Sequence, residues 1–380
     1  MLTRRYAVAS FLAFCLPLTA AAQDIDTAPA TLGDGWVVRK PSEAGLDPAS
    51  ISALVSEIGT GILPNVHAVL IERNGRLVFE RYWPGDDENW GQRIGRVDHG
   101  PATQHDLRSV TKSVTSALLG IALGDTAEDA LARPISSFFP NREALGAGLD
   151  TVTLHHVLTM TAGLEWNEME VPYTDNDNDE IRLYYTDDPV GLVLARSLRD
   201  TPGSRWYYNG GLTQVTAGVI EHLTSKTLDK YAEKVLFGPL GITDFTWHRS
   251  DAWLTNSSPS TASGLRLRAR DLAKIASVIL HNGQWQGRQV VPADWVAAST
   301  ARYVQDNPWG PPGVYGYGYF WYPGTLRSGI KVIRAVGNGD QRIFVLPDVG
   351  LTITVFAGNY NDFRHSVGER IMGQILEALH

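Results

Sequence analysis

Ser109 and Lys112 have the residue types and the spacing of a serine nucleophile and its base. A helix places residues three positions apart on one face, with Cβ atoms about 5–6 Å apart, so the lysine can reach the serine hydroxyl. Small and apolar residues follow Ser109, which predicts a helix that is buried on most sides. Burial disfavours the charged form of a lysine, and a neutral Lys112 can accept the proton of Ser109. The pair therefore predicts acyl transfer through a serine.

A second S-x-x-K pattern occurs at Ser328 and Lys331. It follows a Pro-Gly pair and contains Gly329, which indicates a turn leading into a strand rather than a helix. Without a helix to align the two side chains, this copy is a poor candidate, and Ser109 is favoured as the nucleophile.

Tyr207-Tyr208-Asn209 is the single Y-x-N pattern of the chain. It lies in a loop punctuated by glycine and proline, before the helical stretch 212–225, and loops of this kind often carry catalytic groups. Tyr207 can serve as a phenolic partner in proton transfer, while Asn209 can hold Lys112 or the carbonyl of a substrate. Alternatively, these aromatic residues simply pack under a turn.

The elements that must position these residues begin with a hairpin. Asn74-Gly75 favours a two-residue turn between strands at 67–73 and 77–82. The pattern of the C-terminal part predicts further strands at 315–322, 332–336, 342–346 and 351–357. A last helix is predicted at 363–379. Residues between these two parts are richer in helical patterning. We therefore expect one α/β domain formed by 23–125 and 286–380, with a mainly helical domain at 126–285 inserted into it.

The composition is that of an acidic globular protein. The chain has 380 residues, of which 43% are hydrophobic and 19% charged, enough to bury one large core or two ordinary ones. The formal net charge is −8, and removal of residues 1–22, which hold two arginines and no acid, makes the rest more negative still. A chain with this charge and no basic cluster is a poor binder of nucleic acid or anionic membranes.

Residues 1–22 have the pattern of a signal peptide. Arg4 and Arg5 precede an apolar run at 7–18, and three alanines then suit cleavage before Gln23. The apolar run is too short to span a membrane. We expect the protein to be periplasmic or secreted, exported by the general secretory route or, as an alternative, by the twin-arginine route.

The sequence shows no metal or cofactor motif. The single cysteine, Cys15, lies in the expected leader, so the mature chain has no thiolate ligand and no disulfide. The acidic run 175–180 lacks features of a calcium loop, and the histidine pair at 155–156 lacks the spacing of zinc ligands. We expect no metal site and no cofactor. The surrounding loop, 165–188, either favours substrates with a free amine or is a solvated surface loop.

Two further segments extend the pattern, since residues 154–164 read LHHVLTMTAGL and residues 264–274 read GLRLRARDLAK. Together with S-x-x-K and Y-x-N, and in the same order, they resemble the serine β-lactamase and penicillin-binding superfamily. The resemblance is to its class C-like side, with the esterases and 6-aminohexanoate-dimer hydrolases, and covers residues 63–375. It implies an α/β (α+β) fold with an antiparallel sheet flanked by helices and an inserted, mainly helical domain.

The same resemblance implies roles for four residues. Ser109 would be the acylated nucleophile, and Lys112 and Tyr207 would move its proton. Asn209 would bind the lysine or the substrate. No cofactor is needed for this chemistry.

The family's third motif, K-T-G or H-x-G on a strand, is where this chain departs. No K-T-G occurs, and the best match is AVGNGDQ at residues 335–341. The resemblance implies that Gly337 contacts the substrate and that the backbone amide of Asn338, with that of the nucleophile, forms an oxyanion hole. A plain hairpin turn explains these glycines equally well. Without the lysine, only Arg334 or Arg342 remains to hold the carboxylate of a β-lactam.

The function expected from these features is that of an exported serine hydrolase. It would cleave a small-molecule ester or linear amide through an acyl-enzyme on Ser109. A β-lactamase or D-alanyl-D-alanine carboxypeptidase is the alternative within enzymes. A non-catalytic ligand-sensing module with the same fold is the alternative from another class, because a fold does not by itself imply a function.

Overall fold

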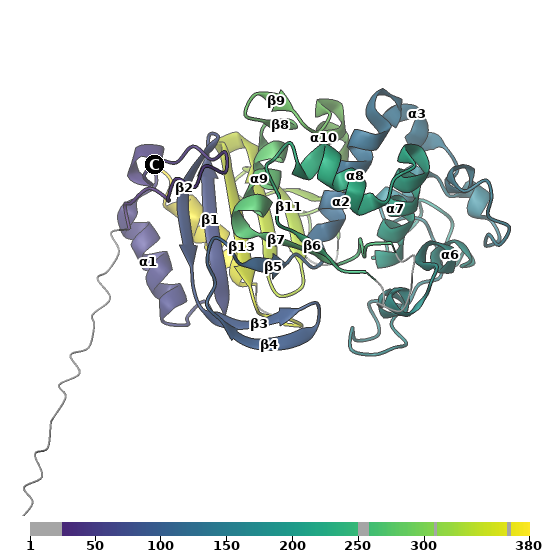
Figure 1. The fold of residues 1–380 in the computed structure, drawn as a ribbon, viewed down its shortest axis with the longest axis horizontal. Helices are drawn as coiled ribbons and strands as arrows, with labels where there is room; N and C mark the ends of the chain where they lie inside the picture. Colours follow the sequence, from purple (N-terminus) through teal and green to yellow (C-terminus); the bar gives the residue numbers. More distant parts are fainter. Residues whose placement is uncertain (1–24, 250–257, 308–309, 363–365) are drawn as a thin grey trace, which may run out of the picture.

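A six-stranded antiparallel sheet forms the core of one half of the molecule (Figure 1). The computed structural model describes residues 25–249, 258–307, 310–362 and 366–380. The strand order is β10-β11-β12-β13-β1-β2. The strands are Val66–Arg73 (β1), Arg76–Tyr82 (β2), Tyr322–Thr325 (β10), Lys331–Gly337 (β11), Gln341–Leu346 (β12) and Leu351–Ala357 (β13). Because β13 pairs with β1, strands from both ends of the chain meet in one sheet.

Asn74 and Gly75 form the turn between β1 and β2. Their φ values are 49° and 78°, and both central residues of a type I′ turn need a positive φ. Asn and Gly adopt this conformation more readily than other residues. The predicted hairpin is confirmed to within one residue at each strand.

Both faces of the sheet are buried, because apolar side chains occupy both sets of alternating positions along its strands. In β1, Val69 belongs to an apolar cluster with α1 (Pro48–Gly59) and α11 (Val367–Glu377). Leu70, the next residue, belongs to the larger cluster on the opposite face, which includes α9 (Ala269–Leu280). The sheet is therefore a layer between helices, as Figure 1 shows.

The strand expected at 315–322 is wrong, since β10 begins only at Tyr322. Gly316 and Gly318 lie so close to a neighbouring loop that a Cβ at either would collide with a backbone carbonyl oxygen. The segment therefore packs as irregular chain. Its alternating aromatic residues are buried in the core, which explains the strand-like pattern.

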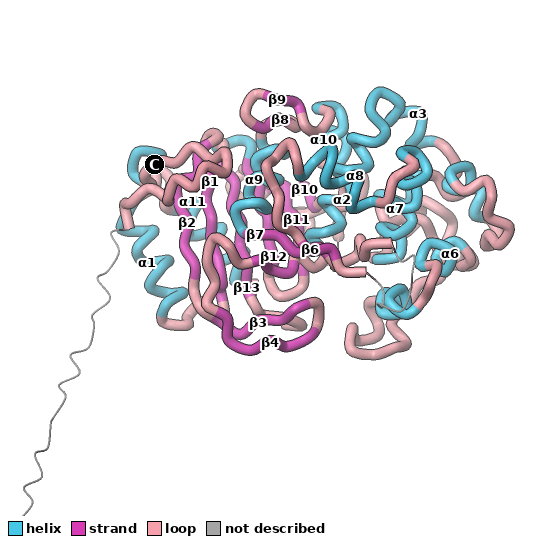
Figure 2. The backbone as a smooth tube through the Cα atoms, in the orientation of Figure 1, coloured by secondary structure: helices cyan, strands magenta, loops and turns pink. Residues whose placement is uncertain are grey.

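A mainly helical region adjoins the sheet (Figure 2). Helix α2 (Val110–Leu123) packs against α7 (Gly210–Thr224) and also against β11 and β12, so it joins the helices to the sheet. The other helices are α3 (Ala127–Ala132), α4 (Leu154–Leu158), α5 (Asp179–Arg182), α6 (Pro189–Leu194), α8 (Leu228–Ala232) and α10 (Ala293–Ser299).

Short strands form three smaller sheets. Strands β3 (Gly85–Asn89) and β4 (Gln92–Val97) form a hairpin, and β8 (Gln284–Trp285) pairs with β9 (Arg288–Gln289). The third sheet has the order β5-β7-β6, and its strands are Gln104–Asp106 (β5), Thr246–Trp247 (β6) and Leu265–Arg268 (β7). Strand β5 leads directly into the segment that carries Ser109.

The predicted fold class, an antiparallel sheet flanked by helices, is confirmed. The division into domains stays a prediction, with one adjustment at its second boundary. Helix α9 falls within the range 126–285 that we assigned to the helical domain, yet it packs on β1, β12 and β13. The sheet domain therefore resumes before α9.

The expected signal peptide at 1–22 lies outside the described residues. Within the described part of the chain, none of the helices combines the length and the apolar character needed to cross a membrane.

Candidate active site

Ser109 lies at the N-terminal end of α2, immediately before its first helical residue. Residues 110–120 are all buried, whereas Ser109 is partly exposed. Arg108 precedes it with a positive φ of 48°, and its guanidinium is held by Asp106 at 3.2 Å and Glu88 at 2.9 Å. This sharp turn leaves Ser109 partly exposed at the end of a buried helix.

The side-chain nitrogen of Lys112 lies next to the Ser109 hydroxyl. Nζ donates to Oγ of Ser109 at 3.1 Å and to the carbonyl oxygen of Ala262 at 2.7 Å. It also lies 3.7 Å from Oε2 of Glu180 and 4.9 Å from the ring centroid of Tyr208. The structure thus brings Ser109 and Lys112 together, and the lysine is only 2% exposed.

Tyr208, and not Tyr207, faces the nucleophile. Adjacent side chains of an extended segment point to opposite sides, and Tyr208 is buried and hydrogen-bonds to Ser109. The hydroxyl of Tyr207 instead donates to the carboxylate of Glu170. The expectation that Tyr207 would join Lys112 is therefore corrected, because Tyr208 occupies that position.

Tyr208 carries its proton at neutral pH. Burial raises its pKa well above the usual value, and the carboxyl groups of Glu168 and Glu180 raise it further. The hydrogen bond with Ser109 lowers this pKa, but by less. The hydroxyl is therefore a proton donor.

Asn209 caps α7 rather than binding the lysine. It precedes the first residue of that helix, and its Oδ1 accepts the backbone N–H of Leu212 at 3.2 Å. Asparagine is among the most favourable residues at this position, because it satisfies an otherwise unpaired N–H group. Instead of the expected contact with Asn209, Lys112 contacts the carbonyl oxygen of Ala262 and the carboxylate of Glu180.

Glu168 and Glu180 form a buried pair next to Lys112. Burial and, to a lesser degree, the neighbouring Glu180 raise the pKa of Glu168 to about 8. Burial also acts to raise the pKa of Glu180, but Lys112 and hydrogen bonds from Glu168 and Tyr184 lower it below its usual value. Glu168 therefore holds a proton at neutral pH, whereas Glu180 is ionised.

Gly210 leaves the space that this pair occupies. A Cβ on Gly210 would lie 2.6 Å from Oε2 of Glu180, closer than carbon and oxygen atoms normally approach. Its backbone N–H donates to Oε2 of Glu168 at 2.6 Å. A glycine at the first position of α7 is thus required for a carboxylate to reach Lys112.

The end of β11 packs against the turn that carries the nucleophile. A Cβ on Gly337 would lie 2.5 Å from the carbonyl oxygen of Leu107, two residues before Ser109. Asn338 follows, and the chain then turns through Gly339 and Asp340, whose φ values are 88° and 67°. Residues 337–341 are therefore a hairpin turn that begins beside the nucleophile.

Arg334 and Arg342 are bound on the α11 side of the sheet. Arg334 pairs with Glu369 of α11, and its guanidinium lies 3.2 Å from the ring centroid of Tyr315. Arg342 pairs with Asp340 at 2.7 Å. Since a partner already neutralises each charge, neither arginine replaces the missing lysine of the third motif.

A cavity of about 550 Å³ opens beside Tyr208. Aromatic and apolar side chains form much of its wall, including Trp206, Tyr207, Met169 and Val304. Tyr208 connects this cavity with the nucleophile, since it lines the cavity and hydrogen-bonds to Ser109.

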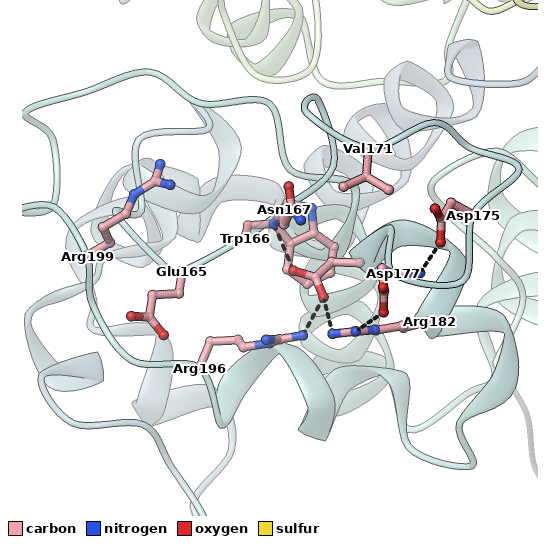
Figure 3. A pocket seen from close by; sticks show the side chains of 10 residues that line it. Glu165, Trp166, Asn167, Val171, Asp175, Asp177, Arg182, Arg196 and Arg199 are labelled. Carbon is pink, nitrogen blue, oxygen red and sulfur yellow. Dashed lines mark hydrogen bonds and ion pairs between the residues drawn. The ribbon is translucent and has the colours of Figure 1, made fainter.

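A second cavity, of about 520 Å³, lies over the loop 165–188, which we call the acidic loop (Figure 3). Its charged residues pair with one another: Asp179 lies 2.7 Å from Arg196 and 3.2 Å from Arg182, and Asp177 lies 2.9 Å from Arg182. Arg199 lines the same cavity. The acids therefore pair with Arg182 of the loop and with Arg196, which follows it, and these partners weaken the expectation that the loop attracts amines.

Comparisons with known proteins identify a family and several relatives of this chain. Residues 65–373 match the family model described as Beta-lactamase. Esterase EstB of Burkholderia gladioli is 28% identical over 216 residues, which are 54% of this chain and 53% of that protein. The 6-aminohexanoate-dimer hydrolase of Paenarthrobacter ureafaciens is 26% identical over 220 residues, which are 54% of this chain and 53% of that protein. The chain thus matches about half the length of these curated relatives.

A penicillin-binding protein homolog from Caulobacter crescentus has a similar structure. The TM-score is 0.67 at 18% sequence identity, and the match covers 88% of this chain and 99% of that chain. At this identity the likeness establishes the fold alone.

Proposed function

Since the chain belongs to the beta-lactamase family, we propose that it is a serine hydrolase that cleaves an ester or a linear amide. The observation that carries this proposal is that Ser109 is partly exposed and that its hydroxyl is hydrogen-bonded to both Lys112 and Tyr208. A serine flanked by a base and a proton donor has the parts needed for covalent acyl transfer.

In the first step, Oγ of Ser109 attacks the carbonyl carbon of the substrate, and the side-chain nitrogen of Lys112 takes the hydroxyl proton. Tyr208 donates its proton to the leaving alcohol or amine and regains one from Lys112. Water then attacks the acyl-enzyme, the same groups move its proton, and the acid product leaves Ser109. No cofactor takes part in these steps.

Glu180 acts on the charge that develops during this reaction. When Lys112 accepts the proton of Ser109, it becomes an ammonium ion in a buried site. The ionised carboxylate 3.7 Å away stabilises that ion, as an acidic residue stabilises the base of other serine hydrolases. Glu168, by staying protonated, keeps a second negative charge out of the pair.

Backbone amides are proposed to hold the oxyanion. The N–H of Ser109 lies at the N-terminus of α2, where N–H groups have no acceptor within the helix. The N–H of Asn338 is the second candidate, because Gly337 packs against Leu107 and brings this turn beside the nucleophile. Two such donors stabilise a tetrahedral intermediate.

Several observations favour esters and linear amides over β-lactams. The third motif has no lysine, and Arg334 and Arg342 have partners on the α11 side of the sheet. The aromatic wall of the cavity beside Tyr208 suits an apolar acyl or alcohol group. Two of the relatives with matching sequence are described as an esterase and as a 6-aminohexanoate-dimer hydrolase. The leader pattern of residues 1–22 supports export to the periplasm or the medium.

The test uses residues 23–380, with Ser109→Ala as the control. Turnover would be measured with a short-chain nitrophenyl ester, a linear aminohexanoate amide, a D-alanyl-D-alanine peptide and a chromogenic cephalosporin. We expect ester or amide hydrolysis that disappears in Ser109→Ala, and a mass increase on Ser109 with a slow substrate. Dominant cleavage of the cephalosporin or the peptide would contradict the proposal. Ligand binding without turnover would indicate a sensing module instead.

A further inference from the structure

Three histidines and one aspartate converge at a second buried site, close in the chain to the nucleophile. His67 lies on β1, Asp87 on β3, His99 after β4, and His105 on β5. One potential ligand atom from each residue falls within 4.8 Å of all the others. His67, Asp87 and His105 are at most 3% exposed.

The hydrogen bonds around His67 fix which of its nitrogens carries hydrogen. Asn65 is oriented by Asp86, because its Nδ2 donates to the backbone carbonyl of Asp86 at 2.9 Å and its Oδ1 accepts the backbone N–H of Asp86 at 3.1 Å. The same Oδ1 lies 3.1 Å from Nε2 of His67. That nitrogen must therefore donate, which leaves Nδ1 of the neutral ring with a free lone pair.

His105 is oriented in the same way. Its Nδ1 lies 3.1 Å from the backbone carbonyl oxygen of Asp106, an acceptor, so Nδ1 carries the hydrogen and Nε2 has the lone pair. Nε2 of His105 lies 2.9 Å from Nδ1 of His67 and 3.3 Å from Oδ1 of Asp87. Three electron-rich atoms thus face one another in the buried interior, and they repel unless a cation lies between them.

Two further atoms at this site have no hydrogen-bond partner among the described residues. They are Oδ2 of Asp87 and Nε2 of His99, both buried and 4.0 Å apart. Oδ1 of Asp87 accepts hydrogen bonds from Tyr360 and from the backbone N–H of Glu88, both at 2.8 Å, so the other oxygen is left to bind a cation. Buried polar atoms normally have partners, and a missing ion is one reason for exceptions.

We propose that His67, Asp87, His99 and His105 form a structural zinc site. Zinc prefers four nitrogen, oxygen or sulfur ligands, and in a tetrahedron with bonds of about 2.0–2.1 Å the ligand atoms lie about 3.3 Å apart. The separations of 2.9 Å between Nδ1 of His67 and Nε2 of His105, and of 4.0 Å between Nε2 of His99 and Oδ2 of Asp87, bracket this value. Rotation of His99, the least buried ligand, closes the widest gap.

The surroundings match those of known metal sites. Metal-bound histidines usually donate their second N–H to a carbonyl or carboxylate, as His67 does to Asn65 and His105 to Asp106. The packing is tight, since a Cβ on Gly358 would lie 2.6 Å from Cε1 of His67. Four protein ligands leave no open position, which assigns the metal a structural role.

The site would fasten the β3–β4 hairpin to the segment before the nucleophile. Asp87 and His99 belong to the hairpin and the loop after it, whereas His105 lies four residues before Ser109. We expected no metal site, because no compact ligand motif occurs in the sequence. The four ligands come from separate elements that only the fold brings together.

The test measures the metal content and the thermal stability of the untagged protein of residues 23–380. Mass spectrometry of the purified protein should find about one zinc per chain, in keeping with a closed four-ligand site. Removal of zinc with a chelator should lower Tm, and added zinc should restore it. Cobalt in place of zinc should give the strong visible absorption of a tetrahedral complex.

His99→Gln and Asp87→Asn should each abolish stoichiometric zinc binding, and chelator should no longer change their Tm. His222→Gln is the matched control, because His222 is exposed on α7 and should not affect the metal. A native protein that contains no zinc, takes up none and keeps its Tm in chelator would overturn the proposal. Equal zinc in the native protein and His99→Gln would also overturn it.

Discussion

Oε2 of Glu180 lies 3.7 Å from Nζ of Lys112, and both side chains are almost completely buried. A buried carboxylate is energetically demanding in a low-dielectric interior, and the neighbouring lysine is the group placed to compensate it. Here the carboxylate comes from the acidic loop and the lysine from α2, so the loop supplies part of the candidate active site.

Replacement of Glu180 by glutamine should lower kcat/KM for ester hydrolysis by about 10²-fold, as loss of an electrostatic stabiliser typically does. The physical reason is that Lys112 would become an ammonium ion with no counterion. Glu221→Gln is the control, since Glu221 is another partly buried glutamate, in α7, and accepts the N–H of Leu228. Steady-state kinetics on folded variants would check this, and equal activity of the two variants would contradict the role given to Glu180.

The two tyrosines should differ sharply in their effect on catalysis. Tyr208→Phe removes the hydroxyl that bonds to Ser109, and we expect kcat to fall by about 10²–10⁴-fold, the usual contribution of general acid–base catalysis. Tyr207→Phe removes the bond to Glu170 and two long contacts from the backbone N–H groups of Glu168 and Met169, none of which involves Ser109, and should leave kcat within about threefold of native. The reverse order of effects would restore the original assignment of Tyr207.

Gly210→Ala should reduce activity although the substitution adds only a methyl group. The new Cβ would lie 2.6 Å from Oε2 of Glu180 and displace the carboxylate from Lys112. Gly373→Ala is the matched control, because Gly373 lies within α11 and a Cβ there meets nothing within 4 Å. We expect the control to keep full activity and to gain up to about 1 kcal/mol of stability from a lower unfolded-state entropy. Full activity of Gly210→Ala would show that the site tolerates this displacement.

Glu168 should make the stability of the protein depend on pH. Its pKa is raised from 4.5 to about 8, so between these values the folded state binds a proton that the unfolded state has released. The unfolding free energy should therefore fall as pH rises through this window, by at most about 1.4 kcal/mol per pH unit.

Glu168→Gln should remove that dependence, because glutamine donates and accepts hydrogen bonds like the protonated acid but cannot ionise. Urea denaturation at pH 5 and at pH 8 would measure it in both proteins. The variant should gain stability relative to the native protein at pH 8. An unchanged difference between the two pH values in the variant would assign the effect to other groups.

The sequence alone was sufficient to predict the local structural features of this protein. Asn74-Gly75 specifies its turn because few residue pairs tolerate two positive φ values, and the periodicity of the strands from 332 to 357 specifies a buried sheet. The contact between Ser109 and Lys112 was also predictable, since helical geometry alone brings residues three apart together. These features depend on neighbours in the chain, which the sequence displays directly.

Only the tertiary structure decided which side chains surround that pair. The Y-x-N pattern led to Tyr207, whereas the direction of the backbone places its neighbour Tyr208 beside Ser109. Glu180 lies 68 positions from Lys112, in an acidic run that resembles many solvated loops. Its carboxylate can reach Lys112 because Gly210 has no side chain to block it. The four candidate zinc ligands likewise share no motif. Contacts between distant segments depend on packing and steric exclusion, which local patterns do not encode.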